Sequence, residues 1–229
     1  MAEAEPSKRL SRAECLTKAQ ECREMARSNQ NPNHRTMLEK MAEAWEQMGE
    51  DEPGELVDGV LQEEEVADSP HEVIVSALLY VLLTWAQPRR ARVLASDAKY
   101  ALSARRGRKP DISVFLTRDR KLPRRGATRH PPDIMIEVIS PDPRNRRRDR
   151  IEKLREYAAF GVRWYWLVDP EAQSIEILAL GKDGHYVHVL DAAEGTIEVP
   201  GCEGLTLDLD ALWRELDEEI EAETPPGDS

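Results

Sequence analysis

The chain has 229 residues, of which 40% are apolar and 33% charged, and its formal net charge is −12. This length allows one medium-sized domain with an appendage, and the composition is that of a soluble globular protein. Three cysteines without metal-binding spacing exclude a cysteine metal site and a disulfide framework, which fits a reducing compartment.

Targeting signals are the next feature that the sequence bears on. The N-terminal segment MAEAEPSKRL lacks the apolar core of a signal peptide. The longest apolar run, residues 73–85, is too short to cross a bilayer and is typical of a buried helix. We therefore expect a cytoplasmic protein without a membrane partner.

Residues 1–50 are predicted to form a helical hairpin. Ser11 and Glu14 have capping-box spacing, and apolar residues then recur at helical intervals up to a turn at residues 29–33. The second helix carries an apolar stripe of Met37, Leu38, Met41, Trp45 and Met48. Two short amphipathic helices cannot bury both stripes alone, so we interpret the hairpin as an interaction or oligomerisation element, with a homodimer as the expected assembly.

Residues 51–213 are predicted to be the main domain. It opens with a pair of strands turned at Asp58 and Gly59, where Glu55 is interpreted as a strand-edge charge. A long helix follows, with Ser69 as the predicted N-cap and Pro70 at its first position. Glu72 completes the capping box, which is enough to explain it.

The most informative stretch is residues 109–153. Residues 112–116 and 134–139 are apolar runs bounded by proline and are predicted to be strands buried on both faces. Asp111 stands at the mouth of the first strand, and Glu137 lies inside the second. A buried carboxylate costs roughly several kcal/mol unless it is paired or binds a metal. Two convergent acids suffice for Mg²⁺ or Mn²⁺, which completes its coordination with waters and phosphate oxygens.

Lys153 follows on a predicted helix, four residues after Asp149 and on the same face. An ammonium group there would stabilise the charge that builds up on an attacked phosphate. Each residue also has a simpler interpretation. Asp111 would close a turn, Glu137 would pair with an arginine, and Lys153 would be a solvated lysine that bridges to Asp149.

Positive charge is concentrated in the same stretch. Residues 89–153 hold 20 Lys and Arg against 8 Asp and Glu, a net of +12, so the rest of the chain carries −24. We expect loops 116–130 and 140–150 to approach a phosphate backbone, although such arginines can also simply solvate loops. The candidate phosphate-binding residues are Arg144, Arg146, Arg147, Arg148 and Arg150.

Two local predictions concern the segment after Glu137. Pro141 and Pro143 resist helix formation, so the beginning of this segment is expected to be irregular. The helix that follows is expected to turn Ile151, Leu154 and Tyr157 inward. The remaining sequence predicts two strands within 161–180, a meander at 184–191 and 195–201 that extends the sheet, and an acidic tail at 214–229.

The segments KPD, EVISP, DxxxK and EYAAFGVRWYWLVDP, in this order, resemble the Uma-two family of bacterial restriction-endonuclease-like proteins in the PD-(D/E)xK nuclease superfamily. The resemblance implies an α/β (α+β) fold with a mixed sheet flanked by helices, Mg²⁺ as cofactor and DNA as substrate. It also implies that Lys153 on the helix takes the role of the strand lysine, because Ile139 occupies the usual position. His71 matches a histidine of the family pattern, and Glu72 is a candidate additional acid, since superfamily members often place one on this helix.

Three functional hypotheses follow. The first is a metal-dependent DNA endonuclease with Asp111, Glu137 and Lys153 as catalytic residues, the two acids being the metal ligands. The second is a non-catalytic DNA-binding or regulatory module on the same fold, which would explain the basic residues without a metal. The third is an assembly protein whose N-terminal hairpin drives dimerisation.

Overall fold

The structure of the chain is a computed structural model that describes residues 12–29, 31–49, 55–57, 60–62, 68–103, 106–124 and 126–223. Ser11, Asp58, Gly59, residues 224–229 and the side chains of Trp45 and Met48 therefore lie outside the described residues. Internal contacts divide the chain into two units, and each is described by itself. The domain boundaries that the sequence suggests stay predictions.

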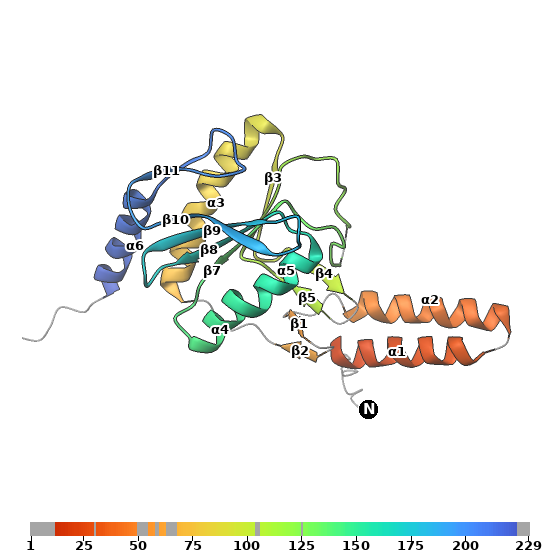
Figure 1. Ribbon diagram of the computed structural model, residues 1–229. Helices are drawn as coiled ribbons and strands as arrows, with labels where there is room; N and C mark the ends of the chain where they lie inside the picture. The colour runs from red at the N-terminus through yellow and green to blue at the C-terminus, as the bar shows by residue number, and fades with distance from the viewer. Residues whose placement is uncertain are drawn as a thin grey trace, which may run out of the picture. The chain divides into compact units, whose positions relative to one another are not determined.

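The first unit contains the helical hairpin and three short strands. Its elements are α1 (Arg12–Ser28), α2 (Pro32–Gly49), β1 (Glu55–Val57), β2 (Val60–Gln62) and β5 (Arg106–Arg108). The two helices lie antiparallel (Figure 1) and meet through small buried residues, Ala19, Cys22 and Ala42. The predicted hairpin is thus confirmed, with a narrow core of its own.

The strands of this unit bury an ion pair. β1 pairs antiparallel with both β2 and β5. Glu55 Oε2 accepts a hydrogen bond of 2.6 Å from Arg108 Nη1, and their side chains are 6% and 0% exposed. The interpretation of Glu55 as a strand-edge charge was therefore wrong, because this carboxylate is buried against a guanidinium.

The second unit is built on a six-stranded sheet in the order β10-β9-β8-β7-β6-β3. β7 and β8 run parallel, and the other neighbours are antiparallel. The strand bounds are β3 (Arg92–Ala95), β6 (Ile112–Phe115), β7 (Ile134–Val138), β8 (Trp164–Asp169), β9 (Ser174–Leu180) and β10 (Tyr186–Ala192). β4 (Tyr100–Ser103) lies where the chain passes from this unit to the first.

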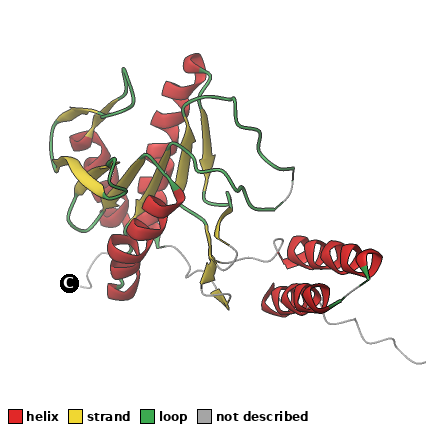
Figure 2. Cartoon of the chain, turned by 45° about the vertical axis from the view of Figure 1, so that its right-hand side comes forward, coloured by secondary structure: helices red, strands yellow, loops and turns green. Residues whose placement is uncertain are grey.

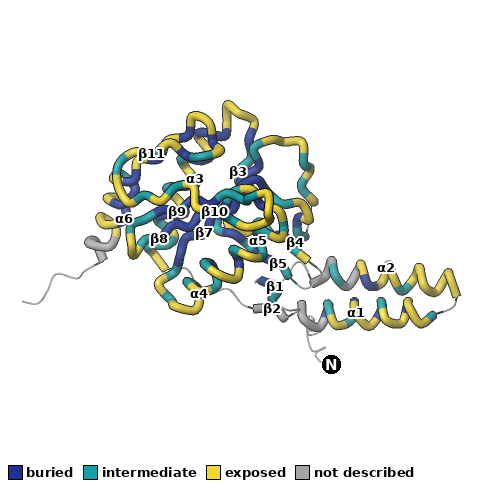
Figure 3. Tube along the Cα trace, in the orientation of Figure 1, coloured by how far each residue is buried: buried dark blue, intermediate teal, exposed yellow. Residues whose placement is uncertain are grey.

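Helices cover both faces of this sheet. On one face, α3 (Ser69–Arg89) and α6 (Leu209–Glu223) pack on Ile134, Ile136 and neighbours of the same strand parity. On the other face, the segment of α4 (Pro143–Arg147), the π-helix η1 (Arg148–Lys153) and α5 (Leu154–Phe160) brings Tyr157 onto Met135 and Tyr165. Figures 1 and 2 show α3 and this segment on opposite sides of the strands, and Figure 3 shows how completely β7 and β8 are buried. The predicted mixed sheet flanked by helices is confirmed.

Three local expectations were wrong, and part of the expected acidic tail is helical. The N-cap of α3 is Asp68, whose carboxylate accepts from the backbone N–H of His71, rather than Ser69. Pro143 does not disrupt a helix; it begins α4 behind its N-cap, Asp142. β11 (Thr196–Glu198) leaves the sheet and pairs with β12 (Thr206–Asp208). Residues 214–223 of the expected tail continue α6, where Leu216 is buried.

α3 also has the length and apolarity of a membrane span, with a mean hydropathy of 1.3. Its residues Ile74, Leu78 and Leu82 are nevertheless buried in the core under the sheet. One side of α3 is thus buried in the core, whereas Tyr80 and Leu83 of the same helix are exposed.

Candidate active site

Glu137 lies on β7, and Asp111 immediately precedes the neighbouring strand, β6. The register of the antiparallel β6–β7 pair places Ile112 opposite Ile136. Extended by one residue, it places Asp111 opposite Glu137, with both side chains on the face of the sheet that carries Tyr157. Asp111 Oδ2 accepts a hydrogen bond of 2.7 Å from the backbone N–H of Val138, which ties its carboxylate to the acid-bearing strand.

Glu137 is 2% exposed and is held by the helical segment above it. Its Oε2 accepts a hydrogen bond of 2.7 Å from Lys153 Nζ, and its Oε1 accepts one of 2.6 Å from the Tyr157 hydroxyl. Lys153 Nζ also lies 3.0 Å from Asp149 Oδ1. The alternative of a solvated Lys153 is therefore wrong, since Lys153 is 4% exposed, whereas its bridge to Asp149 is confirmed. Glu137 pairs with Lys153, where the alternative interpretation expected an arginine.

The π-helix η1 explains why Lys153 points inward. A π-turn closes its hydrogen bonds from residue i to i+5 and holds more residues per turn than the 3.6 of an α-helix. Residues after such a turn are rotated about the axis relative to a continuous α-helix. Ile151, which the helical pattern turned inward, is accordingly 43% exposed, and Lys153 is buried. Tyr157 and Leu154 lie inward as the pattern predicts.

His71 at the beginning of α3 completes the surroundings of Asp111. Its Nε2 lies 3.2 Å from Asp111 Oδ2, and its Nδ1 is 3.6 Å from Glu72 Oε1. The Glu72 side chain is 64% exposed and is joined to Asp111 only through this histidine. Among the described residues, the predicted additional acid therefore lies at the margin of the site.

The pKa of His71 is raised above its ordinary value of 6.5. Burial lowers the pKa, but the hydrogen bond to Asp111 and the charges of Asp111 and nearby acids raise it by more. A raised folded-state pKa means that the pairing stabilises the fold fully below a pH of about 6.5 and that this stability is lost as pH rises through the folded-state pKa.

A His71→Gln variant tests this linkage. We expect the wild type to exceed the variant in free energy of unfolding by more at about pH 5.5 than at about pH 9. The measurement is urea unfolding of metal-free protein at both pH values. An equal difference at the two pH values would show that His71 does not bind an additional proton in the folded state.

Tyr165 is a second buried tyrosine beside the carboxylates of the site. Burial, followed by the negative charges of Glu137, Asp149 and Asp111, holds the pKa of Tyr165 well above its ordinary value. The Tyr165 hydroxyl donates to the backbone carbonyl of Asp149 at 3.0 Å, and its ring meets that of Tyr157 edge to face at 5.2 Å. The hydroxyls of the two tyrosines thus bind the Glu137 carboxylate and the backbone of Asp149.

The five candidate arginines divide into three groups. Arg146 binds the buried carboxylate of Asp169 at 2.8 Å and also pairs with Glu171, and Arg150 pairs with Asp169 and Glu176. Arg144 and Arg147 are exposed, and Arg148 is half-buried with its Nε 3.9 Å from Asp149 Oδ1. Two of the five therefore fix the segment to the ends of β8 and β9, and two others face solvent.

The donor set fits a divalent cation that prefers oxygen ligands. Asp111 keeps a partly exposed carboxylate, and no described residue donates a hydrogen bond to its Oδ1. Each carboxylate oxygen has two lone pairs, so a hydrogen bond to an oxygen of Glu137 does not by itself prevent that oxygen from binding a metal. The carboxylates of Glu137 and Asp149 face the ammonium group of Lys153. His71, beside Asp111, adds a second positive charge only when it is protonated.

The second unit is thus an α/β fold with a mixed sheet, in which one acid lies on β7, another immediately before β6, and a lysine in the crossover between β7 and β8. A crystal structure from Anabaena variabilis, described as "a putative nuclease belonging to DUF820", shares the fold with a TM-score of 0.56 and 22% identity. The alignment covers 71% of this chain and 90% of that one. The sequence matches the family model described as "Uma2: Putative restriction endonuclease" over residues 38–210, and the chain belongs to this family. No curated protein matches.

Sequence reasoning missed two residues of the site. Tyr157 was interpreted only as a packing residue, and Asp149 only as a surface partner of Lys153. Their signal is the spacing of Asp149, Lys153 and Tyr157, each four residues apart and therefore close to one helix face. A polar stripe on the inner face of a helix that packs on a buried glutamate indicates a bonded network rather than solvation.

Proposed function

We propose that the chain is a Mg²⁺- or Mn²⁺-dependent endonuclease of PD-(D/E)xK type that hydrolyses phosphodiester bonds in DNA. The observation that carries the proposal is the buried Glu137 carboxylate, which stands opposite Asp111 and binds Lys153 at 2.7 Å. The family match supports a nuclease, and the chemistry of these residues supports the metal.

Asp111 and Glu137 would hold the cation. Bound there, it would act as a Lewis acid on a phosphate oxygen and lower the pKa of a coordinated water. Lys153 would orient the attacking water and stabilise the negative charge that develops on the phosphate. Asp149 keeps the ammonium group at Glu137, and His71 with the Val138 N–H keeps the Asp111 carboxylate in place.

DNA would be gripped through its phosphates. Arg144 and Arg147 are exposed at the start of the helical segment that carries Lys153, so they would reach the backbone first. Arg146, Arg148 and Arg150 would add positive electrostatic potential near the DNA backbone without necessarily contacting it. Arg146 and Arg150 are bound to carboxylates of the protein. Such contacts position DNA without reading its sequence.

The test is plasmid nicking by Asp111→Asn and Glu137→Gln with Mg²⁺, Mn²⁺ or EDTA. We expect each variant to lose about 100-fold or more of the rate, because removal of a ligand charge weakens both metal binding and water activation. EDTA should abolish nicking by the wild type. Retained nicking by purified, folded Glu137→Gln would refute the assignment.

Asp133→Asn is the matched control. Asp133 is a buried carboxylate just before the other end of β7, where it accepts from the Leu116 N–H at 2.9 Å. The substitution removes one charge near the same strand without touching Asp111 or Glu137. We expect it to nick at close to the wild-type rate, which separates loss of metal ligands from loss of buried charge.

The alternative is a non-catalytic DNA-binding or regulatory module. It is favoured by one observation: the part of the chain that the structure describes holds no group of three or more His, Cys, Asp or Glu suited to a metal ion. In that case DNA binding would need no metal and would persist in the Asp111→Asn/Glu137→Gln variant, and no nicking would be seen in the wild type.

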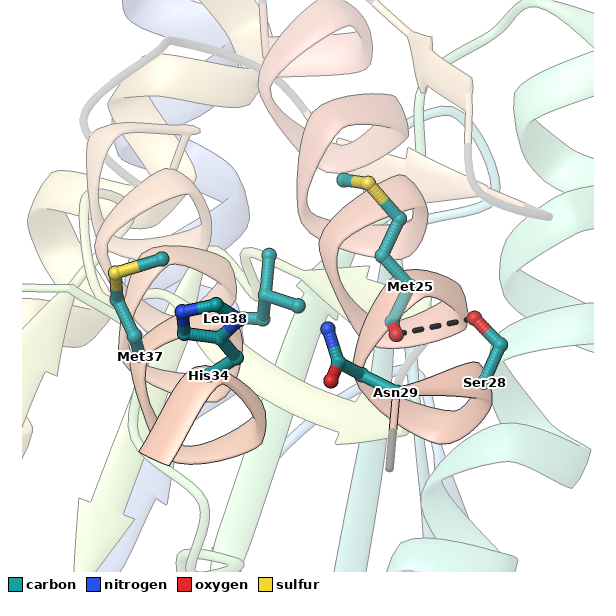
Figure 4. Close-up of a pocket in the computed structure, with 6 residues that line it drawn as sticks. All are labelled: Met25, Ser28, Asn29, His34, Met37 and Leu38. Carbon is teal, nitrogen blue, oxygen red and sulfur yellow. Dashed lines mark hydrogen bonds between the residues drawn. The ribbon is translucent and has the colours of Figure 1, made fainter. Parts of the chain in front are cut away.

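We propose that the hairpin binds a second copy of the chain. We also propose that the protein is cytoplasmic. Met25, Met37 and Met41 are 43–52% exposed, and Figure 4 shows Met25 and Met37 lining a pocket near the turn between α1 and α2. The core between the two helices consists of small residues. Flexible methionine side chains suit such a contact, and a matching face on a second hairpin would cover them.

A further inference from the structure

The Tyr157 hydroxyl is a buried polar group that the proposed reaction does not use. Tyr157 is fully buried, and its hydroxyl donates to Glu137 Oε1 at 2.6 Å. Its ring is fixed by the edge-to-face contact with Tyr165 at 5.2 Å. The hydroxyl therefore meets the carboxylate from a side chain that has little freedom to move.

Lys153 and Tyr157 grip the two oxygens of one carboxylate from one helix face. They are four residues apart, on either side of the junction between η1 and α5, and they bind Oε2 and Oε1 respectively. Two donors on two oxygens fix the rotation of the carboxylate about its terminal bond, whereas one donor leaves it free to turn. The lone pairs that remain are then held in fixed directions.

The π-turn contributes to this arrangement. In a continuous α-helix, residues i, i+4 and i+8 drift around the axis, since eight residues exceed two turns of 3.6. The wider turn of η1 reduces that drift between Asp149 and Lys153. Asp149, Lys153 and Tyr157 consequently share the face that lies on β7, where the structure joins them to Glu137 directly or through Lys153.

We propose that Tyr157 is a positioning residue that holds the Glu137 carboxylate in the orientation required to bind a divalent metal. The inference rests on the proposed function. Hydrogen-bond partners of metal ligands typically change metal affinity about 10- to 100-fold when they are removed. Tyr157 touches neither water nor substrate in this role, and it acts through Glu137 alone.

The test is Mn²⁺ binding to metal-free Tyr157→Phe by calorimetry, without DNA. The variant keeps the ring and its contact with Tyr165 and removes one oxygen. We expect the Kd for Mn²⁺ to rise about 10-fold or more. In nicking assays, the Mn²⁺ concentration for half-maximal rate should rise with it, and the rate at saturating Mn²⁺ should return to near the wild-type value.

Tyr100→Phe is the matched control. Tyr100 is also fully buried, and its hydroxyl shares a hydrogen bond of 2.6 Å with Ser113 rather than with a carboxylate. We expect it to lose as much thermal stability as Tyr157→Phe and to keep the wild-type Kd for Mn²⁺. A similar rise in Kd for both variants would overturn the proposal, because the effect would then be one of general packing.

The outcomes separate this role from the proposed function. Binding of Mn²⁺ by the wild type with an unchanged Kd in Tyr157→Phe overturns the positioning role alone. Absence of Mn²⁺ binding by the wild type overturns the metal-dependent function and this role with it. Failure of Tyr157→Phe to fold in a thermal melt also overturns the role, since the hydroxyl would then serve stability.

Discussion

A Lys153→Met variant is expected to lose about 3–5 kcal/mol of unfolding free energy at neutral pH, because it leaves a buried ion pair with one partner missing. Glu137 and Asp149 would then lie beside each other without the ammonium that links them. Methionine replaces most of the side-chain volume, so a cavity contributes little. The loss is measured by urea unfolding of wild type and variant.

The pH dependence of this loss identifies its cause. Without Lys153 the carboxylates of Glu137 and Asp149 would repel each other, and acid relieves such repulsion, so the variant should regain stability as the pH falls. The double variant Lys153→Met/Glu137→Gln removes one of the two stranded charges and should recover part of the loss at neutral pH. A loss that is independent of pH and unrelieved in the double variant would point to packing instead of charge.

The second large effect is expected in the first unit. Replacement of Arg108 by Leu leaves the Glu55 carboxylate, 6% exposed, without the guanidinium that binds it at 2.6 Å. We expect a cost of about 3–5 kcal/mol, since the removal of one partner from a buried ion pair costs more than the lost contact itself. Thermal unfolding followed by circular dichroism measures it.

The control exploits the asymmetry of buried ion pairs. Glu55→Leu/Arg108→Leu removes both charges from the β1–β5 pair, and well-packed apolar residues in their place are often neutral or stabilising. The double variant should therefore be more stable than Arg108→Leu alone. If the double variant were the less stable of the two, the pair would stabilise the fold through more than mutual neutralisation.

The strands of the sheet could be read from the sequence because burial on both faces leaves continuous apolar runs. Ile112–Phe115 and Ile134–Val138 are strands in the structure, and all their residues are buried. The carboxylate in the second run was conspicuous for the same reason. Glu137 needed a partner, and the structure supplies two.

The helical segment after Glu137 could be predicted only in part. Helical periodicity assumes 3.6 residues per turn, and η1 breaks this period, so Ile151 and Lys153 exchange the sides that the pattern assigns. No residue type marks a π-turn in the sequence, so the helical pattern could not predict it. Asp142 and Pro143 did carry a readable signal, because aspartate followed by proline is the pattern of an N-cap and first helical residue.

The end of the sheet depended on pairing rather than on propensity. Residues 184–191 and 195–201 both look like strands, yet only β10 joins β9. β11 instead pairs antiparallel with β12, and α6 follows directly after β12. An alternating or apolar pattern predicts that a segment is a strand, but it does not predict which other strand it pairs with.

The parallel pairing of β7 and β8 has a consequence for how the protein folds. Parallel neighbours need a crossover, and here α4, η1 and α5 provide it. The glutamate, the lysine and the tyrosine therefore belong to one consecutive β-α-β unit, and their contacts close short loops of low entropic cost. This half of the site is expected to gain protection from hydrogen exchange early in refolding, while Asp111, which arrives across the long segment between β6 and β7, joins it later.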